Sequence, residues 1–400
     1  MTRQRLNPAL IRRLNVARVF HALRLSGGMS QSELAELTGL DPATVSAVVR
    51  QLRVDGWLLS KKGPSAGRAG RPPTQLAIDP AAGFLVGARL EPDMVRLLAT
   101  SMAGEVRASW QAAAGSEVED VLDTLTRGVE ELLRGLGASW DQVRGIGVGV
   151  PALMSHGGRV AYGPNLRWHD VPLLELLAER WSVPVAVDND TSAAALAEKL
   201  FGAAREASDF VVIAGHSGIG GALYLGGRLY RGHDGFAGEI GHACVEPGGR
   251  SCACGDAGCL EAYLAQQGLE AQLSERGRSL ATYEAVARAA AAGDEVVLDL
   301  LDEAGERLGR VIADLIDLLD PELVVLAGGL SHVVPWLLPA IERVRSSESL
   351  GRYRGRCRVA LSDLGPEAVT MGGVGLAMEA VLSLPSWMVD QDGLLGARRG

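Results

Sequence analysis

Near the start of the chain, apolar positions follow the period of an α-helix. After Asp41, the residues that recur at spacings of three and four are Val45, Val48, Val49 and Leu52. Asp41 is a natural N-cap, and Pro42 suits the first helical turn because its φ is fixed. The pattern predicts a helix with one face buried and the opposite face available for another role.

A shorter amphipathic segment precedes this helix. Ser30 begins it, Gly39 supplies the turn that ends it, and its apolar face carries Leu34, Ala35 and Leu37. An amphipathic stretch at 8–27 comes before, and the strand-like "GWLLSKK" at 56–62 comes after. Together these elements predict a winged helix-turn-helix, although a plain helical hairpin would show the same periodicity.

The outward face of the second helix has a composition typical of a helix that binds in a groove of DNA. It carries Ala43, Thr44, Ser46, Ala47, Arg50 and Gln51. Small residues let a helix lie deep in a major groove, while hydroxyl groups and a guanidinium suit phosphates and base edges. We therefore expect these six residues to bind DNA.

From about residue 76, the pattern of apolar and polar residues changes. Apolar strands separated by glycine turns alternate with helices rich in Ala, Leu and Glu, which indicates an α/β class. Residues 83–108 and 209–232 share one pattern of strand, turn, strand, glycine turn and strand, and each is later followed by a buried strand, at 143–153 and 321–331. This duplication predicts two similar lobes with a ligand cleft between them.

Charge supports the division into a DNA-binding head and a different body. Residues 1–75 hold 12 Lys and Arg against 4 Asp and Glu, whereas the whole chain has a net charge of −9. A basic head on an acidic body fits a nucleic-acid-binding module. A solvated basic tail is the alternative, but the head is too apolar and too periodic for disorder.

The segment 63–75 is rich in Gly, Pro and basic residues, so we expect an extended linker. Arg68 and Arg71 within it are candidates for insertion into a narrow, A·T-rich minor groove. A simple spacer is an equally weighted interpretation.

Length and hydropathy bear on location. The 400 residues exceed what one hydrophobic core usually serves, and the N-terminus has no apolar signal region. The most apolar stretch, 311–330, is interrupted by acidic residues before it reaches spanning length. We expect a cytoplasmic protein with no membrane partner.

Four of the five cysteines lie within residues 238–263. The spacing of His242, Cys252, Cys254 and Cys259 supplies three thiolates and one imidazole, a complete tetrahedral set for Zn²⁺, and it leaves no open position for catalysis. A disulfide scaffold is disfavoured because the cytosol keeps thiols reduced. We predict one structural zinc per chain, with Cys244 and Cys357 as ordinary buried or bystander thiols.

Taken together, the motifs resemble the ROK family, which contains sugar kinases and sugar-responsive repressors. They are "GRAGRPP", "GVGVPALM", "GPNLRWHDVPL", "VDNDTSAAALAE", "SGIGGALYLGGRLYRG", "AGEIGHACVEPGGRSCACGDAGCLEAY" and "LDPELVVLAGGLS". The resemblance runs from about residue 10 to 380. It implies an actin/hexokinase-like body of two ribonuclease-H-like lobes behind a winged helix-turn-helix.

The resemblance also implies site residues and domain limits. The positions that match the family's sugar-binding groups are Asn165, Asn189, Asp190, Glu239, His242 and Glu261. His242 would then bind zinc with one ring nitrogen and face the sugar with the other. The expected domains are a winged helix at 1–62, a linker at 63–75, lobes at 76–200 and 201–382 with a zinc loop at 242–259, and a tail at 383–400.

Phosphoryl transfer depends on positioning the nucleotide phosphates, and here the first phosphate loop departs from the kinases. "VGARLEPD" replaces their D-x-G-G-T pattern, so bulky Arg89, acidic Glu91 and Pro92 stand where small residues would cradle phosphate. The second loop, 215–221, is retained apart from His216, and Ser192 replaces the usual Asn. Asp190 matches the kinases' base, but we expect no catalytic residues.

These expectations combine into a sugar-responsive repressor of carbohydrate metabolism genes. We expect a homodimer or homotetramer on an approximately palindromic operator, with sugar closing the cleft by a hinge motion that changes operator affinity. Two alternatives stay open: an ATP-dependent sugar kinase with an appended DNA-binding domain, and an architectural DNA binder that ignores sugars.

Overall fold

A computed structural model describes residues 8–62, 74–155, 157–346 and 355–382. Arg68, Arg71 and the tail at 383–400, for which we stated expectations, lie outside the described residues. The chain forms two compact units. One comprises Met1–Val148, Leu173–Val187 and Gly373–Gly400, and the other comprises Gly149–Pro172 and Asp188–Gly372.

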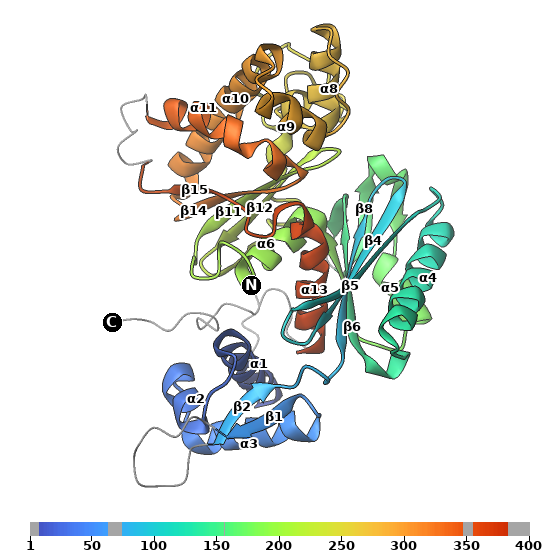
Figure 1. Cartoon of the computed structure of the whole chain (residues 1–400), viewed down its shortest axis with the longest axis vertical. Coiled ribbons are helices and arrows are strands. Elements are labelled where there is room, and N and C mark those ends of the chain that lie inside the picture. Colours follow the sequence, from blue (N-terminus) through green and yellow to red (C-terminus); the bar gives the residue numbers. More distant parts are fainter. Residues whose placement is uncertain (1–7, 63–73, 156, 347–354, 383–400) are drawn as a thin grey trace. The chain divides into compact units, whose positions relative to one another are not determined.

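The N-terminal elements form the predicted winged helix-turn-helix. They are α1 (Pro8–Ser26), α2 (Gln31–Thr38), α3 (Pro42–Val54), β1 (Leu58–Lys62) and β2 (Thr74–Ile78) (Figure 1). Ser30 and Glu33 form a reciprocal capping box at the start of α2, and Gly39 ends that helix with φ 66°. Strands β1 and β2 pair antiparallel, so the wing takes its second strand from residues that we had divided between the linker and the first lobe.

This domain has a hydrophobic core of its own. The predicted apolar face of α3 is buried, as is the central part of α1 around Val19, Phe20 and Leu23. The ring of Trp57 meets that of Phe20 edge to face, with centroids 5.8 Å apart. Asp41 caps α3 by accepting the backbone N–H groups of Ala43 and Thr44, each at 3.0 Å.

The first five-stranded sheet of the body has the strand order β10-β6-β3-β4-β5. Its strands are β3 (Phe84–Leu90), β4 (Met94–Ser101), β5 (Val106–Ala113), β6 (Val143–Val150) and β10 (Val185–Asn189). Helix α4 (Val118–Leu136) packs on β4 and β5, where a side chain at Gly128 would collide with Leu97 and Trp110. Helices α5 (Leu173–Arg180) and α13 (Ala368–Val381) and the short η1 (Trp140–Gln142) complete this part of the chain.

The second five-stranded sheet, with order β13-β12-β11-β14-β15, repeats that topology and confirms the predicted duplication. Its strands are β11 (Phe210–Gly215), β12 (Ile219–Leu225), β13 (Arg228–Tyr230), β14 (Leu323–Gly328) and β15 (Arg358–Leu361). In both sheets three consecutive strands form an antiparallel meander, and a later strand joins the first of them. Here β14 pairs parallel to β11, from Phe210 opposite Leu323 to Gly215 opposite Gly328.

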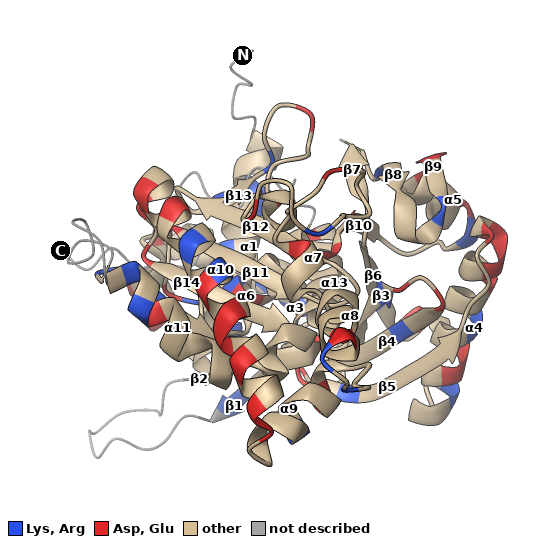
Figure 2. Cartoon of the chain, turned by 90° about the horizontal axis from the view of Figure 1, so that it is seen from above, with Lys and Arg blue, Asp and Glu red and all other residues tan. Residues whose placement is uncertain are grey.

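The helices of this second part are α6 (Asp190–Leu200), α7 (Glu261–Leu264), α8 (Gln266–Glu275), α9 (Tyr283–Ala291), α10 (Glu295–Leu319) and α11 (Val334–Ser346). Helices α10 and α11 approach closely because Gly305 and Gly309 present no side chain to Leu337 and Ile341. Charges of both signs are interspersed along the two helices (Figure 2). Arg343 of α11 forms an ion pair with Asp302 of α10 at 2.7 Å.

Shorter elements complete the description. A three-stranded sheet contains β7 (Leu153–Ser155), β8 (Arg159–Gly163) and β9 (Trp168–Val171). Short helical turns occur at η2 (Pro164–Leu166), η3 (Ile240–His242), η4 (Gly329–His332) and η5 (Gly365–Glu367). Within the described ranges, every helix is too short or too polar to traverse a lipid bilayer.

Candidate binding cavity and metal centre

The six residues expected to bind sugar all line one cavity of about 330 Å³. Its lining residues come from 151–192 and 214–261, which we had assigned to different lobes. In the structure they all belong to the second compact unit, because that unit takes up Gly149–Pro172 and then resumes at Asp188. The cavity is therefore complete within one folded unit.

Asn189 and Asp190 occupy the junction between β10 and α6. Asn189 is the N-cap of the helix, and its Oδ1 accepts the backbone N–H groups of Thr191 and Ser192 at 2.9 and 3.0 Å. Its Nδ2 donates to the carbonyl of Ala152 at 3.1 Å. Asp190 Oδ1 lies 2.7 Å from the nitrogen of Thr191. The helix start thus fixes both side chains at the cavity wall.

Asn165 and Glu239 reach the cavity from short helical turns. Asn165 belongs to η2, directly after β8, and Glu239 precedes η3. Burial raises the pKa of Glu239 above its ordinary value, and the charges of Asp190 and Glu261 act in the same direction, while His242 opposes them. Three carboxylates therefore lie close enough to influence one another.

Glu261, the first residue of α7, is held by the glycine turn between β11 and β12. Its Oε2 accepts the backbone N–H of Ile219 at 2.9 Å. Within the turn, the N–H of His216 donates to the carbonyl of Gly218 at 2.8 Å. The same carboxylate approaches the cysteines, since its Oε1 lies 3.8 Å from Cys252 Sγ.

The expected metal ligands are gathered together. The ligand atoms of His242, Cys252, Cys254 and Cys259 all lie within 4.8 Å of one another. Cys252 Sγ is 3.7 Å from His242 Nδ1, and Cys254 Sγ is 3.8 Å from Cys259 Sγ. Gly255 and Gly258 form the return of the loop with φ values of 101° and 86°, a region that side chains disfavour. Such a cluster could hold one tetrahedral metal ion.

Without a metal, the surroundings of Cys259 favour the neutral thiol. Burial raises the pKa of Cys259 to about 12, and the neighbouring Cys254 and Cys252 act in the same direction. A bound metal reverses this preference, because a coordinating thiol is deprotonated outright. Of the other cysteines, Cys357 is buried as expected, whereas Cys244 is exposed and stands outside the cluster.

His242 faces both centres. Its Nδ1 lies beside Cys252 Sγ, while its Nε2 lies 3.8 Å from Glu239 Oε2. One imidazole therefore has a nitrogen in the metal cluster and a nitrogen beside a cavity carboxylate.

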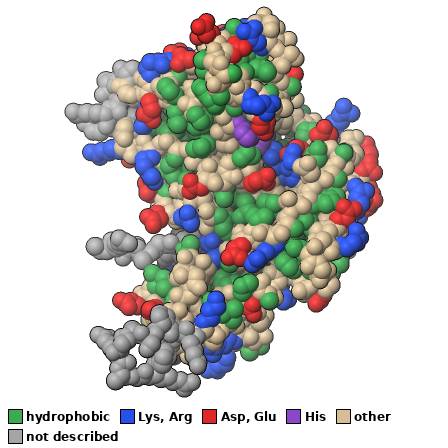
Figure 3. Space-filling view, in the orientation of Figure 1, with side chains coloured by type: hydrophobic (Ala, Val, Ile, Leu, Met, Phe, Trp, Pro, Cys, Tyr) green, Lys and Arg blue, Asp and Glu red, His purple; other side chains and the backbone are tan. Residues whose placement is uncertain are grey.

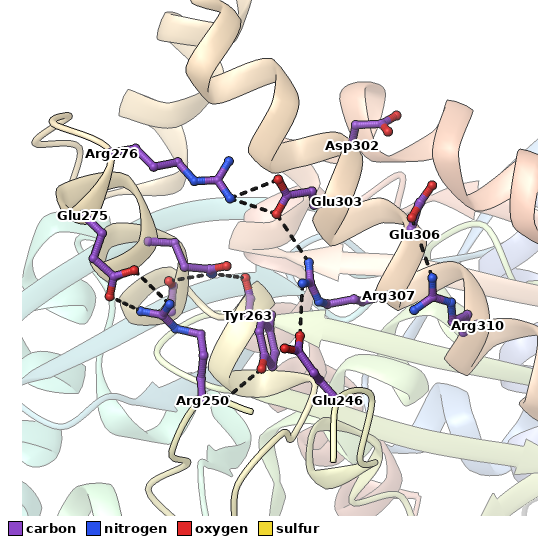
Figure 4. A network of polar contacts seen from close by, with 12 residues as sticks. Glu246, Arg250, Tyr263, Glu275, Arg276, Asp302, Glu303, Glu306, Arg307 and Arg310 are labelled. Atoms are coloured by element: carbon purple, nitrogen blue, oxygen red, sulfur yellow. Dashed lines mark hydrogen bonds and ion pairs between the residues drawn. The ribbon is translucent and has the colours of Figure 1, made fainter. Parts of the chain in front are cut away.

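A network of ion pairs fastens the metal loop to neighbouring helices (Figure 4). Arg307 of α10 reaches Glu246 of the loop at 3.2 Å and lies 4.5 Å from the ring centroid of Tyr263. The hydroxyl of Tyr263 accepts the backbone N–H of Arg250 at 2.8 Å, and Arg250 pairs with Glu275 of α8. These contacts hold the loop without using the candidate metal ligands.

Other residues that line the cavity were not predicted from the sequence. Tyr162 and His216 line the cavity, together with Leu153 and Met154. Tyr162 is three residues before the candidate Asn165 in the sequence, and this closeness could have indicated that it lines the same cavity. His216 also has a structural contact, because its Nδ1 accepts the N–H of Gly329 at 3.2 Å.

The residues on the outward face of α3 differ in exposure and in the hydrogen bonds of their side chains. Ala43, Ala47 and Arg50 are exposed. Thr44 and Ser46 are half-buried, and the Thr44 hydroxyl donates to Asp41 at 2.6 Å. Gln51 accepts from Arg12 at 2.6 Å, and its amide donates to Asp55.

Basic side chains are visible on the surface of the winged helix (Figure 3). Arg12, Arg13, Arg50 and Arg53 are among its exposed residues. The outward face of α3 thus combines the small side chains of Ala43 and Ala47 with the exposed guanidinium of Arg50, which suits contact with a DNA duplex.

The turn between β3 and β4, where we expect no phosphate binding, has ion pairs between its own side chains. Glu91 accepts from Arg96 Nε at 2.9 Å and lies 3.2 Å from Arg89 NH2. Arg89 is almost fully buried. Bulky, mutually paired side chains fill a turn that would need open backbone donors to bind phosphate.

Comparison with known proteins agrees with this architecture. The ROK family model matches residues 94–380, and the MarR family model matches residues 12–69. The putative xylose repressor of Caldicellulosiruptor sp. (strain Rt8B.4) is 27% identical over 398 residues, covering 96% of this chain and 100% of that protein. The DNA-binding transcriptional dual regulator NagC of Escherichia coli (strain K12) is 28% identical over 388 residues, covering 94% and 95%.

Among solved structures, a regulator and a kinase of the same family differ in how much of this chain they match. The crystal structure of a ROK family transcriptional regulator, described as a homolog of the E. coli MLC protein, gives a TM-score of 0.80 at 29% identity, over 96% of this chain and 98% of its own. A ROK family glucokinase from Streptomyces griseus, solved with glucose and AMPPNP, gives 0.66 at 26% identity, over 74% of this chain and 99% of its own. The regulators match 94% to 96% of the chain, whereas this kinase matches 74% of it.

Proposed function

The chain belongs to the ROK family, and from this premise we propose that it is a sugar-responsive DNA-binding transcriptional regulator, a repressor of carbohydrate metabolism genes. One observation carries the proposal: the likeness to repressors extends over the winged helix as well as the body, at 96% coverage of the chain. The kinase likeness stops short of that coverage. The paired Arg89 and Glu91 in the former phosphate loop add a physical reason why the chain is a regulator and not an enzyme.

The cavity is the proposed sugar site. Asn165, Asn189, Asp190, Glu239, His242 and Glu261 would bind the sugar, since amide and carboxylate oxygens accept hydrogen bonds from hydroxyl groups. Support comes from their convergence on one cavity and from the rigid placement of Asn189 and Glu261 by backbone donors.

The cysteine cluster is the proposed site of one structural zinc per chain, held by His242, Cys252, Cys254 and Cys259. Four protein ligands complete a tetrahedral shell, so the ion would stabilise the loop without binding a substrate. The position of His242 means that the ion would also orient a cavity residue.

Operator binding is proposed for the exposed face of α3, through Ala43, Thr44, Ser46, Ala47, Arg50 and Gln51, and for Arg68 and Arg71 beyond it. A homodimer or homotetramer would place two such helices on an approximately palindromic operator, as expected for a cytoplasmic regulator. For domain limits we keep 1–62, 63–75, 76–200, 201–382 and 383–400 as proposals. The pairing of β1 with β2 argues for extending the first of them to Ile78.

The test combines operator selection with a sugar panel. Duplexes selected from random DNA by the purified chain should contain two related half-sites, and one sugar of the panel should change their affinity at least tenfold. Incubation of the chain with the same sugar and MgATP should give no sugar phosphate. Operator affinity that stays constant with every sugar would contradict the proposal, and ATP-dependent turnover would favour the kinase.

A further inference from the structure

We propose that Cys244 is a site of oxidative modification, at which a peroxide drives formation of a disulfide with Cys259 and so releases the metal ion. Cys259 is one of the four candidate ligands, whereas Cys244 stands outside that cluster. The release of metal rests on the proposed zinc site, but the pairing of the two cysteines is a property of the loop itself.

The two cysteines lie directly opposite each other. Cys244 and Cys259 form an isolated antiparallel β-bridge. The hydrogen bonds on either side of it join their chain neighbours: the N–H of Val245 donates to Gly258 at 2.8 Å, and the N–H of Leu260 donates to Ala243 at 2.9 Å. The cysteines are therefore a non-hydrogen-bonded pair, in which opposite Cα atoms are about 4.5 Å apart.

This geometry suits a disulfide. Opposite residues of an antiparallel pair have their side chains on one face, and a disulfide joins Cα atoms about 4.4 to 6.8 Å apart. Gly258 lets the two segments approach, since a Cβ there would overlap the carbonyl oxygen of Glu246 and lie 3.4 Å from Cys244 Sγ. The sulfur of Cys244 thus lies beside the residue that precedes Cys259, and the bond requires no large movement of the backbone.

Exposure gives the two cysteines different roles. Cys244 is exposed, whereas Cys259 is 2% exposed. Cys254 is exposed as well, but a metal ion in the cluster would hold its thiolate. A dissolved oxidant therefore meets Cys244 as the accessible thiol outside the ligand set. Redox-sensing cysteines are accessible and often stand next to a second cysteine that resolves them.

The proposed reaction has two steps. The Cys244 sulfur attacks one oxygen of hydrogen peroxide, the O–O bond breaks, and a sulfenic acid and one water are formed. The Cys259 sulfur then attacks the sulfenic sulfur, so an S–S bond forms and the hydroxyl group leaves as a second water. In sum, two thiols and one peroxide give one disulfide and two waters, with sulfur oxidised and peroxide oxygen reduced.

The disulfide withdraws the Cys259 sulfur from the cluster. A zinc site that loses one of four ligands binds its ion more weakly. His242 would then lose the ion that orients its ring beside Glu239, so the oxidation would reach the wall of the cavity. Thiol–disulfide exchange with a reductant reverses the change, as in other transient disulfides of reducing compartments.

The experiment treats the zinc-loaded full chain with hydrogen peroxide and follows free zinc with a colorimetric chelator. Trypsin cleaves after Arg250, which separates Cys244 in the peptide 232–250 from the candidate ligand cysteines in the peptide 251–276. We expect these peptides to become linked as zinc is released, at about 2 Da below their summed mass. Fragmentation should place the bond on Cys259, and dithiothreitol should separate the peptides.

Two variants test the cause. Cys244→Ser keeps all four candidate ligands, so it should retain zinc and, under peroxide, release it at least about tenfold more slowly than wild type. Cys357→Ser, which changes a buried cysteine outside the cluster, should release zinc at the wild-type rate.

Three results would overturn the inference: equal release rates in wild type and Cys244→Ser, a disulfide confined to the peptide 251–276, or a bond that joins two chains through Cys244. Linked peptides in a chain that takes up no zinc would instead overturn the proposed metal site and support the pairing. The failure of one is thus distinguishable from the failure of the other.

Discussion

Glu261 Oε2 accepts a 2.9 Å hydrogen bond from the backbone N–H of Ile219, which joins the first residue of α7 to the first residue of β12. The carboxylate thereby has a fixed position at the cavity, between the glycine turn and the cysteine cluster. A ligand that meets Glu261 finds an acceptor that is already ordered, which reduces the entropy lost on binding.

Gly218→Ala should displace the Glu261 carboxylate without disturbing the metal cluster. A Cβ at Gly218 would overlap Glu261 Oε2, and the backbone there does not require a positive φ. We expect sugar affinity to fall at least tenfold because Glu261 must move, while zinc content stays at one per chain. Titration with sugar and metal analysis check the two halves of the prediction. Gly135→Ala is the matched control, since its Cβ would meet nothing within 4 Å.

Cys254→Ser should remove the metal and weaken sugar binding together. The variant loses one of four ligands, so we expect less than about a tenth of the wild-type zinc and an unfolding free energy lower by about 4 kcal/mol. Metal analysis and denaturant unfolding measure these effects. Cys244→Ser is the control because Cys244 is exposed and outside the cluster. Full zinc retention in Cys254→Ser would exclude the assigned ligand set.

Arg307→Ala should loosen the attachment of the metal loop to α10. The substitution removes the contacts of Arg307 with Glu246 and with the ring of Tyr263, so zinc should pass to a chelator several times faster. Arg310→Ala removes a neighbouring arginine of the same helix whose ion pair is longer, at 3.7 Å to Glu306. Equal release rates in the two variants would show that the network does not hold the loop.

Arg50→Ala should weaken operator binding. Arg50 is exposed on α3, and loss of one base-contacting arginine costs about 1–3 kcal/mol, or roughly 5- to 150-fold in affinity. Fluorescence anisotropy with the selected operator measures the change. Arg134→Ala, an exposed arginine near the end of α4, carries the same loss of charge and should have no effect. An unchanged footprint in Arg50→Ala would remove α3 from the interface.

Acidification should destabilise the winged helix through His21. Burial lowers the pKa of His21 from 6.5 to about 3, and the charge of Arg24 acts in the same direction. Between these two pH values the unfolded state binds a proton that the folded state does not, so stability falls as pH falls. The expected slope well below pH 6.5 is about 1.4 kcal/mol per pH unit. Hydrogen exchange of the α1 amides between pH 7.5 and 5 measures it, and His21→Phe should flatten it.

Local rules made several elements predictable from the sequence. Asp41, Pro42 and the spacing of Val45 and Val48 predict α3 because capping and periodicity act within a few residues. The gathering of the candidate metal ligands was predictable for the same reason, since His242 and Cys259 lie on one short loop.

Other features depend on contacts between distant segments. Nothing in "TQLAI" indicates that β2 pairs with β1, because strand partners are set by tertiary structure. The spacing of α3 places Gln51 on its outward face, and its side chain accepts a hydrogen bond from Arg12 of α1, which lies 39 residues earlier in the chain. The two compact units also interleave along the chain, which no local pattern reveals.

His242 stands beside both the cysteine thiols and the cavity carboxylate Glu239. If one ion and one sugar both depend on this imidazole, their two binding equilibria are thermodynamically linked, and each ligand must change the affinity of the other by the same factor. The affinity of the chain for a sugar would then depend on whether the cysteine cluster holds its ion. A single histidine would make gene regulation by nutrients conditional on metal nutrition.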